Sequence, residues 1–187
     1  MKKDIENCLR TLQTGGLILY PTDTIWGIGC DATNAAAVNK VYRVKRRDDR
    51  KSLIILLADE QDIVRYVPDP PPGILDFLKT AARPTTVIYE KAFGLPDNLV
   101  NPDGGIAIRI VQDAFCKELI ERLGKPVVST SANISGEASP RNFKEINPSL
   151  LEQVDYIVHY RQNDSGEQAA SRIVKMHADG SFQVIRP

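Results

Sequence analysis

The sequence has few of the residues that build the commonest catalytic centres. Its 187 residues include 2 histidines, 3 cysteines and 1 tryptophan. His159 and His177 have no metal-ligand partner at helical or hairpin spacing, so we expect both at the surface. The cysteines form no Cys-x-x-Cys pair, and a sparse, odd set is typical of a reduced protein rather than a disulfide framework.

Other absences argue against whole classes of protein. No apolar run approaches the roughly 20 residues of a membrane span, and the start, MKKDIENCLRTL, is too charged for a secretory signal. The phosphate loop GxxxxGK[ST], the GxGxxG fingerprint and the GxSxG elbow are all missing. Basic and acidic residues balance at 24 each, so the net charge indicates neither nucleic acid nor membrane. We expect a cytoplasmic protein with no membrane partner.

The apolar pattern predicts an α/β fold in one domain, residues 1–187. Apolar residues make up 42% of the chain, enough for a sizeable core. We expect helices at 3–14, after Thr33 or Asn34, after Asp59, and at 113–123. Strands are expected in LILY, SLIILLA, TTVIYE, GIAIRIV, PVVST, VDYIVHY, SRIVKMH and SFQVIRP. Because strands and helices do not alternate strictly, we expect an open, mixed sheet with helices on its faces.

Residues 126–140, PVVSTSANISGEASP, form an apolar strand that breaks into hydroxyls, an amide and a glycine. One interpretation is a polar turn that closes the strand, because Ser, Asn and Gly bond the local backbone. The other is a cradle of donors for an anionic ligand, at the end of a strand where open α/β sheets bind ligands. The segment alone leaves both open, and polar turns are the commoner case.

Residues 39–51, NKVYRVKRRDDRK, concentrate positive charge. They hold seven basic residues against two acidic ones, a net of +5, in a chain that is neutral as a whole. A helix C-terminus favours nearby cations by about 0.3–1 kcal/mol each, which explains two or three of them. Seven within thirteen residues repel one another, and a bound anion is the simpler account of the rest. Lys45 and Arg47 combine a mobile point charge with a planar fork, a pair that suits phosphate.

Four segments then match one family in order. LILYPTDTIWGIGCDA is similar to the motif YPT[DE]T-x-x-G-L-G, and KRRDDRKSLIIL to a Lys-x-Arg motif before a Leu-rich strand. GIAIRIV is similar to VAVRIP, and STSANISGEASP to TSAN-x-SG-x-x-SP. In these segments, and in SRIVKM and VIRP near the C-terminus, the chain resembles YrdC/TsaC-type threonylcarbamoyl-AMP synthases. The resemblance implies a YrdC-like open, twisted mixed sheet with a concave, positively charged cavity.

It also implies a chemistry. The family's enzymes are nucleotidyltransferases that form threonylcarbamoyl-adenylate and pyrophosphate from L-threonine, bicarbonate and ATP. Mg²⁺ is expected on the phosphates with water ligands of its own, so no protein metal ligand is assigned. The product serves tRNA threonylcarbamoyladenosine modification. The expected partners are therefore tRNA or double-stranded RNA, and downstream proteins of the TsaB, TsaD and TsaE type.

The resemblance assigns roles to particular residues. The catalytic pair would be Lys45 and Arg47, gripping the triphosphate. The further ATP contacts would be Lys51, Ser131, Asn133 and Arg186. The threonine contacts would be Thr24, Arg109, Ser131 and Ser171, with Arg109 a natural partner for the carboxylate.

Simpler interpretations accompany these roles. Thr24 could cap a turn after Pro21, and Asp23 is equally an Asx-turn residue or an acid near the amine. Trp26 is expected in the core or cavity wall rather than as a stacking platform for adenine. Arg186 lies one residue from the C-terminus and could be disordered.

Five residues depart from the family's usual pattern, and they affect the triphosphate wall more than the threonine pocket: Asp48, Ser52, Arg83, Arg141 and Arg172. YciO-type relatives share the fold without the same role, and many lose the Lys-x-Arg and Ser-x-Asn pairs that this sequence retains. Two functions outside this family remain as alternatives. One is a non-catalytic RNA-binding module that uses the basic groove. The other is an ATP-binding regulator indifferent to threonine.

Overall fold

The computed structural model describes residues 1–46, 53–166 and 169–187, which include one nine-stranded sheet. The strands are β1 Ile18–Tyr20, β2 Gly27–Gly29, β3 Ile54–Leu57, β4 Thr85–Tyr89, β5 Ile106–Ile110, β6 Val127–Ser131, β7 Tyr156–Ile157, β8 Arg172–Met176 and β9 Phe182–Arg186. Their order is β7-β1-β2-β6-β3-β5-β4-β8-β9. The pairs β1–β7, β3–β5 and β4–β8 are parallel and the other pairs antiparallel. The predicted open, mixed sheet is confirmed, whereas the division into one domain stays a prediction.

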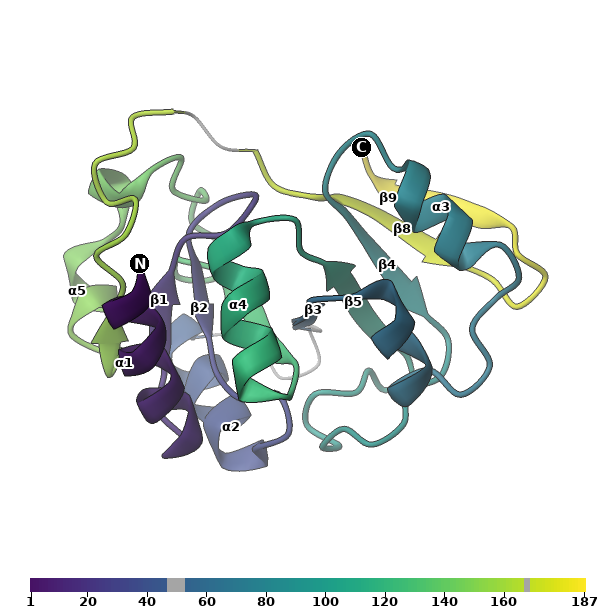
Figure 1. Ribbon diagram of the computed structural model, residues 1–187, viewed down its shortest axis with the longest axis horizontal. Coiled ribbons are helices and arrows are strands. Elements are labelled where there is room, and N and C mark those ends of the chain that lie inside the picture. Colours follow the sequence, from purple (N-terminus) through teal and green to yellow (C-terminus); the bar gives the residue numbers. More distant parts are fainter. Residues whose placement is uncertain (47–52, 167–168) are drawn as a thin grey trace.

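Helices cover both faces of this sheet (Figure 1). They are α1 Lys2–Gln13, α2 Ala35–Lys45, α3 Ile74–Thr80, α4 Ala114–Leu123 and α5 Pro148–Leu151, with 3₁₀ helices η1 Glu60–Arg65 and η2 Phe143–Glu145. Helices α1 and α4 pack side by side on the face toward the viewer, and α2 lies behind the sheet. None of the helices in the described part of the chain has the length and apolarity to cross a membrane.

Local sequence sets the helix boundaries. Asn34 caps α2 by accepting a hydrogen bond from the backbone N–H of Ala37 at 3.1 Å. Asp59 caps η1 and Asp113 caps α4 in the same way. Gly124, with φ of 69°, closes α4 in the left-handed conformation that glycine adopts without strain. A cap at Thr33 or Asn34 and one at Asp59 were expected from the sequence, and Asn34 and Asp59 take these positions. The helix expected at 113–123 begins one residue later, with Asp113 as its cap.

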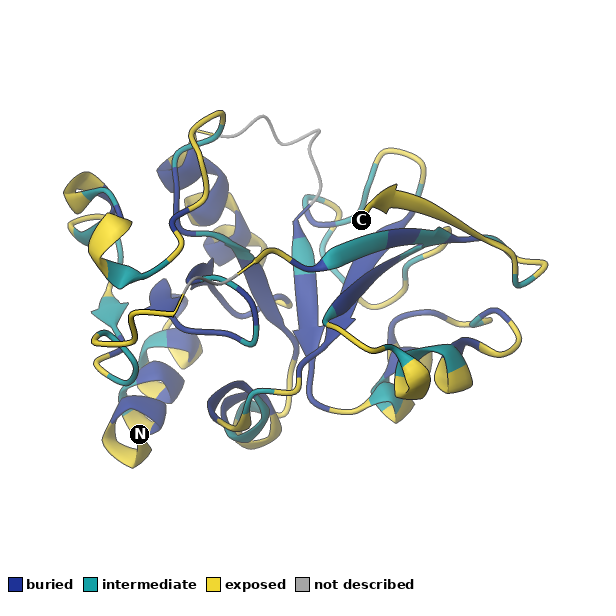
Figure 2. Cartoon of the chain, turned by 90° about the horizontal axis from the view of Figure 1, so that it is seen from above, coloured by how far each residue is buried: buried dark blue, intermediate teal, exposed yellow. Residues whose placement is uncertain are grey.

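The core lies between the central strands and the inward faces of the helices (Figure 2). Ile5, Leu9 and Leu12 of α1 are buried, as the helical spacing predicted. The three cysteines are also buried and free, and burial raises the pKa of the Cys8 thiol to about 12. At the far end of the sheet, every residue of β9 is exposed.

Strand β2 was not expected from the sequence, because two of its three residues are glycines. It pairs antiparallel with β1 on one side and with β6 on the other. A Cβ at Gly29 would lie 2.7 Å from Cε1 of Tyr20 and 2.7 Å from the carbonyl oxygen of Val128, so no side chain fits there. The strand therefore depends on close packing against its neighbours rather than on strand propensity.

Candidate ligand-binding site

A cavity of about 190 Å³ opens on one face of the sheet. Thr86 and Arg109 are paired neighbours in β4 and β5, and both line this cavity. We call this side the arginine face and the cavity the arginine-face cavity. Its lining residues are Thr24, Ile25, Trp26, Gly27, Leu53, Ile54, Thr86, Arg109, Ser129, Thr130, Ser131, Ser139, Ala170, Ser171, Ile173 and Arg186. Four of the predicted threonine contacts and two of the predicted ATP contacts are thus brought together.

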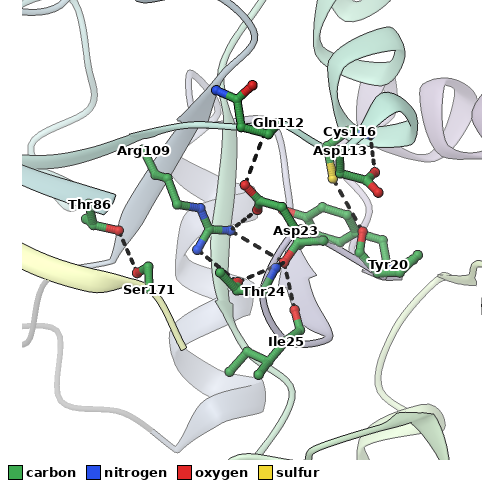
Figure 3. Close-up of polar contacts among 12 residues, drawn as sticks. Tyr20, Asp23, Thr24, Ile25, Thr86, Arg109, Gln112, Asp113, Cys116 and Ser171 are labelled. Atoms are coloured by element: carbon green, nitrogen blue, oxygen red, sulfur yellow. Dashed lines mark hydrogen bonds and ion pairs between the residues drawn. The ribbon is translucent and has the colours of Figure 1, made fainter. Parts of the chain in front are cut away.

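Arg109 is the buried cation of this cavity, with only 3% of its side chain exposed (Figure 3). Its Nη1 donates to Oγ1 of Thr24 at 3.0 Å, and its Nη2 lies 3.3 Å from Oδ1 of Asp23. Its Nε has no hydrogen-bond partner among the described residues. A guanidinium carries five N–H donors in a fixed fork. A buried fork with an unused donor beside a cavity is suited to an incoming carboxylate or phosphate.

The loop between β1 and β2 presents Thr24 to the cavity. Oγ1 of Thr22 accepts a hydrogen bond from the backbone N–H of Thr24 at 3.0 Å and donates to the carbonyl of Ile25 at 2.8 Å. Thr22 therefore shapes the turn, and Thr24 is left to face Arg109. Asp23 forms no Asx-turn, because its Oδ2 accepts the backbone N–H of Gln112 at 3.2 Å.

Ser171 and Arg186 form another side of the cavity. Oγ of Ser171 lies 2.8 Å from Oγ1 of Thr86, and its carbonyl accepts two bonds from the Arg186 guanidinium, at 3.0 and 2.6 Å. Arg186 is therefore placed by specific contacts rather than disordered. Partial burial and the positive charge of Arg109 lower the pKa of Arg186 below its ordinary value. Both arginines line the same cavity, and an anion between them would offset the repulsion of their charges.

Lys45 ends α2 beneath the segment that follows β6, and only 1% of the residue is exposed. Its ammonium donates to the carbonyls of Ser131 and Asn133, each at 2.5 Å, and to Oδ1 of Asn133 at 2.9 Å. Oγ of Ser131 lies 3.3 Å away and bonds Oδ1 of Asn133. Three predicted ATP contacts therefore meet, with the ammonium directed onto the Ser131–Asn133 segment.

The polar run at the end of β6 and just beyond it both forms a turn and lines the cavity. Asn133 stabilises a turn by donating from Nδ2 to the carbonyl of Glu137 at 2.7 Å. Ser129, Thr130 and Ser131 line the arginine-face cavity instead. The strand therefore delivers hydroxyls to the cavity before the turn begins. Trp26 packs against Phe143 with ring centroids 4.9 Å apart and lines the cavity, so it is the wall residue that was expected.

Several predictions concern residues that the structure does not describe: Arg47, Asp48, Lys51 and Ser52. The positive charge predicted for the whole concavity also stays a prediction. The other departures from the family pattern have visible surroundings. Arg141 pairs with Glu145 at 2.7 Å, and Arg172 lies over the ring of Phe182 at 5.8 Å. Arg83 lines a different cavity, discussed below.

Two threonines of the site were missed in the sequence, Thr22 and Thr86. Thr86 is fully buried, and it meets Ser171 because β4 and β8 pair in parallel. The only sequence signal for Thr86 is the pair Thr85–Thr86 at the start of a predicted strand, and such a pair is weak evidence for a site. Thr22 belongs to the quoted YPTDT motif, whose first threonine was given no role.

Among the residues that the structure describes, the lining of the arginine-face cavity contains hydroxyls and two guanidinium groups but no carboxylate. In the described part of the chain, no group of three or more His, Cys, Asp or Glu residues could hold a metal ion. Mg²⁺ prefers oxygen ligands and keeps several waters. This donor set therefore fits an ion that arrives on a ligand's phosphates, and it offers no dedicated metal cage.

The fold and this site define an α/β protein with a polar cavity beside a buried arginine on one face of its sheet. A family model named Sua5/YciO/YrdC, with the description "Telomere recombination", matches residues 10–187. The chain belongs to this family, as its sequence motifs predicted.

Individual relatives agree with this assignment. The threonylcarbamoyl-AMP synthase of Stenotrophomonas maltophilia is 34% identical over 157 residues, 82% of this chain and 84% of that protein. The fold matches Sua5 of P. abyssi complexed with L-threonine, with a TM-score of 0.85, 23% identity and coverage of 98% of this chain and 53% of that one. It matches YciO of E. coli with a TM-score of 0.83, 23% identity and coverage of 100% and 89%. The chain thus spans about half the length of the P. abyssi protein.

Proposed function

We propose that this protein is a threonylcarbamoyl-AMP synthase, an enzyme that forms threonylcarbamoyl-adenylate and pyrophosphate from L-threonine, bicarbonate and ATP. The observation that carries the proposal is the unpaired Nε of the buried Arg109, beside the hydroxyls of Thr24 and Ser171. This arrangement suits an α-amino acid whose carboxylate binds the guanidinium and whose polar groups bind the hydroxyls. The names of the relatives point to the same amino acid.

The chemistry asks the protein mainly to position its reactants. The neutral amine of threonine attacks the carbon of bicarbonate, water leaves, and a carbamate forms. A carbamate oxygen then attacks the α-phosphorus of ATP, the bond between the α-phosphorus and the bridging oxygen breaks, and pyrophosphate leaves. Holding the groups in line and neutralising their charge can supply most of the rate. A histidine base is not required, which agrees with a chain that has only two histidines.

We assign the nucleotide to the side of the cavity where Ser131 and Arg186 lie. The cavity of about 190 Å³ is smaller than the 300–1,000 Å³ typical of sites for drug-sized ligands. It has room for the amino acid, and we expect the triphosphate to extend toward Arg47 and Lys51. Lys45 would grip the triphosphate together with Arg47, and Asn133, which bonds Ser131, would contact the nucleotide as well. Mg²⁺, bound on the phosphates, would offset their charge.

Because the product is an activated carbamoyl group, we place the protein in tRNA threonylcarbamoyladenosine modification in the cytoplasm. TsaB-, TsaD- and TsaE-type proteins would consume the product, and tRNA would be the final acceptor. The fold alone does not separate this role from that of YciO, whose structure matches nearly as well as Sua5. The retained Lys45, Ser131 and Asn133, which contact one another, favour the synthase.

The substrate site is tested with Arg109→Lys, which keeps the charge and loses the fork. Losing a charged hydrogen bond costs about 1.5–3 kcal/mol, so the KM for threonine should rise roughly ten- to a hundredfold. Arg122→Lys on the exposed surface of α4 is the matched control and should leave KM unchanged. Equal KM values for the two variants would contradict the carboxylate site.

The RNA-binding alternative is separated by the double variant Ser131→Ala, Asn133→Ala. Phosphate-backbone binding would survive this change and would weaken by orders of magnitude between 50 and 200 mM salt. The synthase would instead lose threonine-dependent pyrophosphate release. Retained activity in this variant would overturn the assignment of these two residues.

A further inference from the structure

A second, larger cavity lies on the other face of the sheet, at the same strand ends. Its volume is about 680 Å³, and Thr85, Ile110, Lys117 of α4 and Lys79 of α3 contribute to its lining. Adjacent residues in a strand point to opposite faces. Thr85 and Ile110 accordingly line this helix-face cavity, while their neighbours Thr86 and Arg109 line the arginine-face cavity.

Neighbouring residues of the loop between β1 and β2 also line different cavities. Thr24 lines the arginine-face cavity and is absent from the lining of the other. Asp23 lines the helix-face cavity and is absent from the lining of the first. The Asp23–Arg109 ion pair, 3.3 Å long and drawn in Figure 3, therefore joins a residue that lines one cavity to a residue that lines the other.

Asp23 is itself held by one hydrogen bond and one ion pair. Its side chain is 8% exposed, and Oδ2 accepts the backbone N–H of Gln112, just beyond β5. Its Oδ1 faces Nη2 of Arg109. The Asp23 carboxylate thus links the Arg109 guanidinium to the backbone of Gln112, just beyond the end of β5. Asp23 lines the helix-face cavity, whereas a ligand of Arg109 would lie in the arginine-face cavity.

We propose that Asp23 is a positioning residue that fixes the Arg109 fork for carboxylate binding without touching the substrate. This inference rests on the proposed function. An arginine side chain has many rotamers, and a fork held in place before the ligand arrives loses less freedom on binding. The role differs from both sequence interpretations, since Asp23 neither closes an Asx-turn nor reaches the cavity in which the amine would lie.

Asp23→Asn tests the proposal cleanly. Asp offers two oxygens for the two donors, Gln112 N–H and the Arg109 guanidinium, whereas Asn has one oxygen and an amide that donates. One of the two contacts must therefore fail. We expect the KM for threonine to rise about tenfold while kcat at saturating threonine and the KM for ATP stay within about twofold. Asp23→Glu keeps both oxygens and should recover part of the loss.

Asp113→Asn is the matched control. Asp113 is paired with Arg161 at 3.1 Å and is similarly buried, but it does not contact Arg109. Asn also caps helices well, so α4 should keep its N-terminus. The KM for threonine should not change in this variant.

The measurement is threonine binding by calorimetry, together with steady-state kinetics. It is made on wild type, on the single variants Asp23→Asn, Asp23→Glu, Asp113→Asn and Arg109→Lys, and on the double variant Asp23→Asn, Arg109→Lys. The proposal expects Asp23→Asn to add little once the fork is gone, since the two residues act as a unit. Tighter threonine binding in Asp23→Asn would mean that Asp23 only offsets the positive charge of Arg109. Unchanged binding would mean that Asp23 does not position the Arg109 guanidinium. Either result overturns the inference and leaves the proposed function standing. A wild-type protein that binds no threonine overturns both.

Discussion

Replacing Lys45 by methionine should destabilise the fold more than its single charge suggests. The ammonium is buried and bonds the carbonyls of Ser131 and Asn133, and Oδ1 of Asn133. It thereby joins the end of α2 to the segment after β6, more than 80 residues away in the sequence. Methionine fills a similar volume but donates no hydrogen bond.

The magnitude follows from which acceptors lose their partners. The carbonyl of Ser131 still accepts the backbone N–H of Asn133 at 2.9 Å, and Oδ1 of Asn133 still bonds Oγ of Ser131. The carbonyl of Asn133 is left without its ammonium donor. A buried acceptor without a partner costs about 1–3 kcal/mol, and a lost hydrogen bond to a charged group about 1.5–3 kcal/mol. We expect a loss of about 3 kcal/mol in the free energy of unfolding, which is about 6–12 °C in Tm for a chain of this size.

Urea unfolding followed by tryptophan fluorescence measures this loss. Trp26 is the only tryptophan, and its carbonyl accepts the backbone N–H of Ala132 within the affected segment. The control is Lys40→Met on the same helix, where Nζ contacts a single carbonyl, that of Gly15, at 2.7 Å. Because Lys40 is exposed, water can replace its ammonium at that carbonyl, so this substitution should cost less than about 1 kcal/mol. A Lys45→Met protein as stable as the control would refute the reasoning.

Two further predictions concern stability. Burial works to raise the pKa of the Asp4 carboxyl, but hydrogen bonds from Tyr156 and His159 bring it below the ordinary 3.8. Asp4→Asn should therefore unfold about 1–2 kcal/mol more easily at pH 6. Because the folded pKa is depressed, the deficit should vanish as pH falls through it; a deficit that persists in acid would contradict this. Gly29→Ala should cost about 1–3 kcal/mol by overpacking, measured by urea denaturation, and an unchanged midpoint would show that β2 can shift.

Much of the fold could be predicted because local signals and the final packing agree. Asn34 and Asp59 are cap candidates in the sequence and cap α2 and η1 in the structure. The apolar spacing in 3–14 matches the buried face of α1. Strand β2 could not be predicted in this way. Its residues Gly27 and Gly29 carry no strand preference, and the strand exists through pairing with β1 and β6.

In the candidate site, too, some features could be predicted from the sequence and others depend on the folded structure. Thr24, Arg109, Ser171 and Arg186 were named from motifs, and the structure brings all four to one cavity. The contacts that orient them join residues distant in sequence, and such pairings cannot be read from spacing. Ser171 meets Thr86 only because β8 pairs with β4. Likewise, Asp23 contacts Gln112 and Arg109, which are more than 80 residues away in the sequence, and spacing could not predict these contacts.

The central claim is tested most directly by pyrophosphate release from ATP and Mg²⁺, with and without L-threonine and bicarbonate, and with L-serine as the control amino acid. The account predicts release that requires both threonine and bicarbonate and is much slower with serine. ATP turnover indifferent to threonine, or no turnover at all, would contradict it.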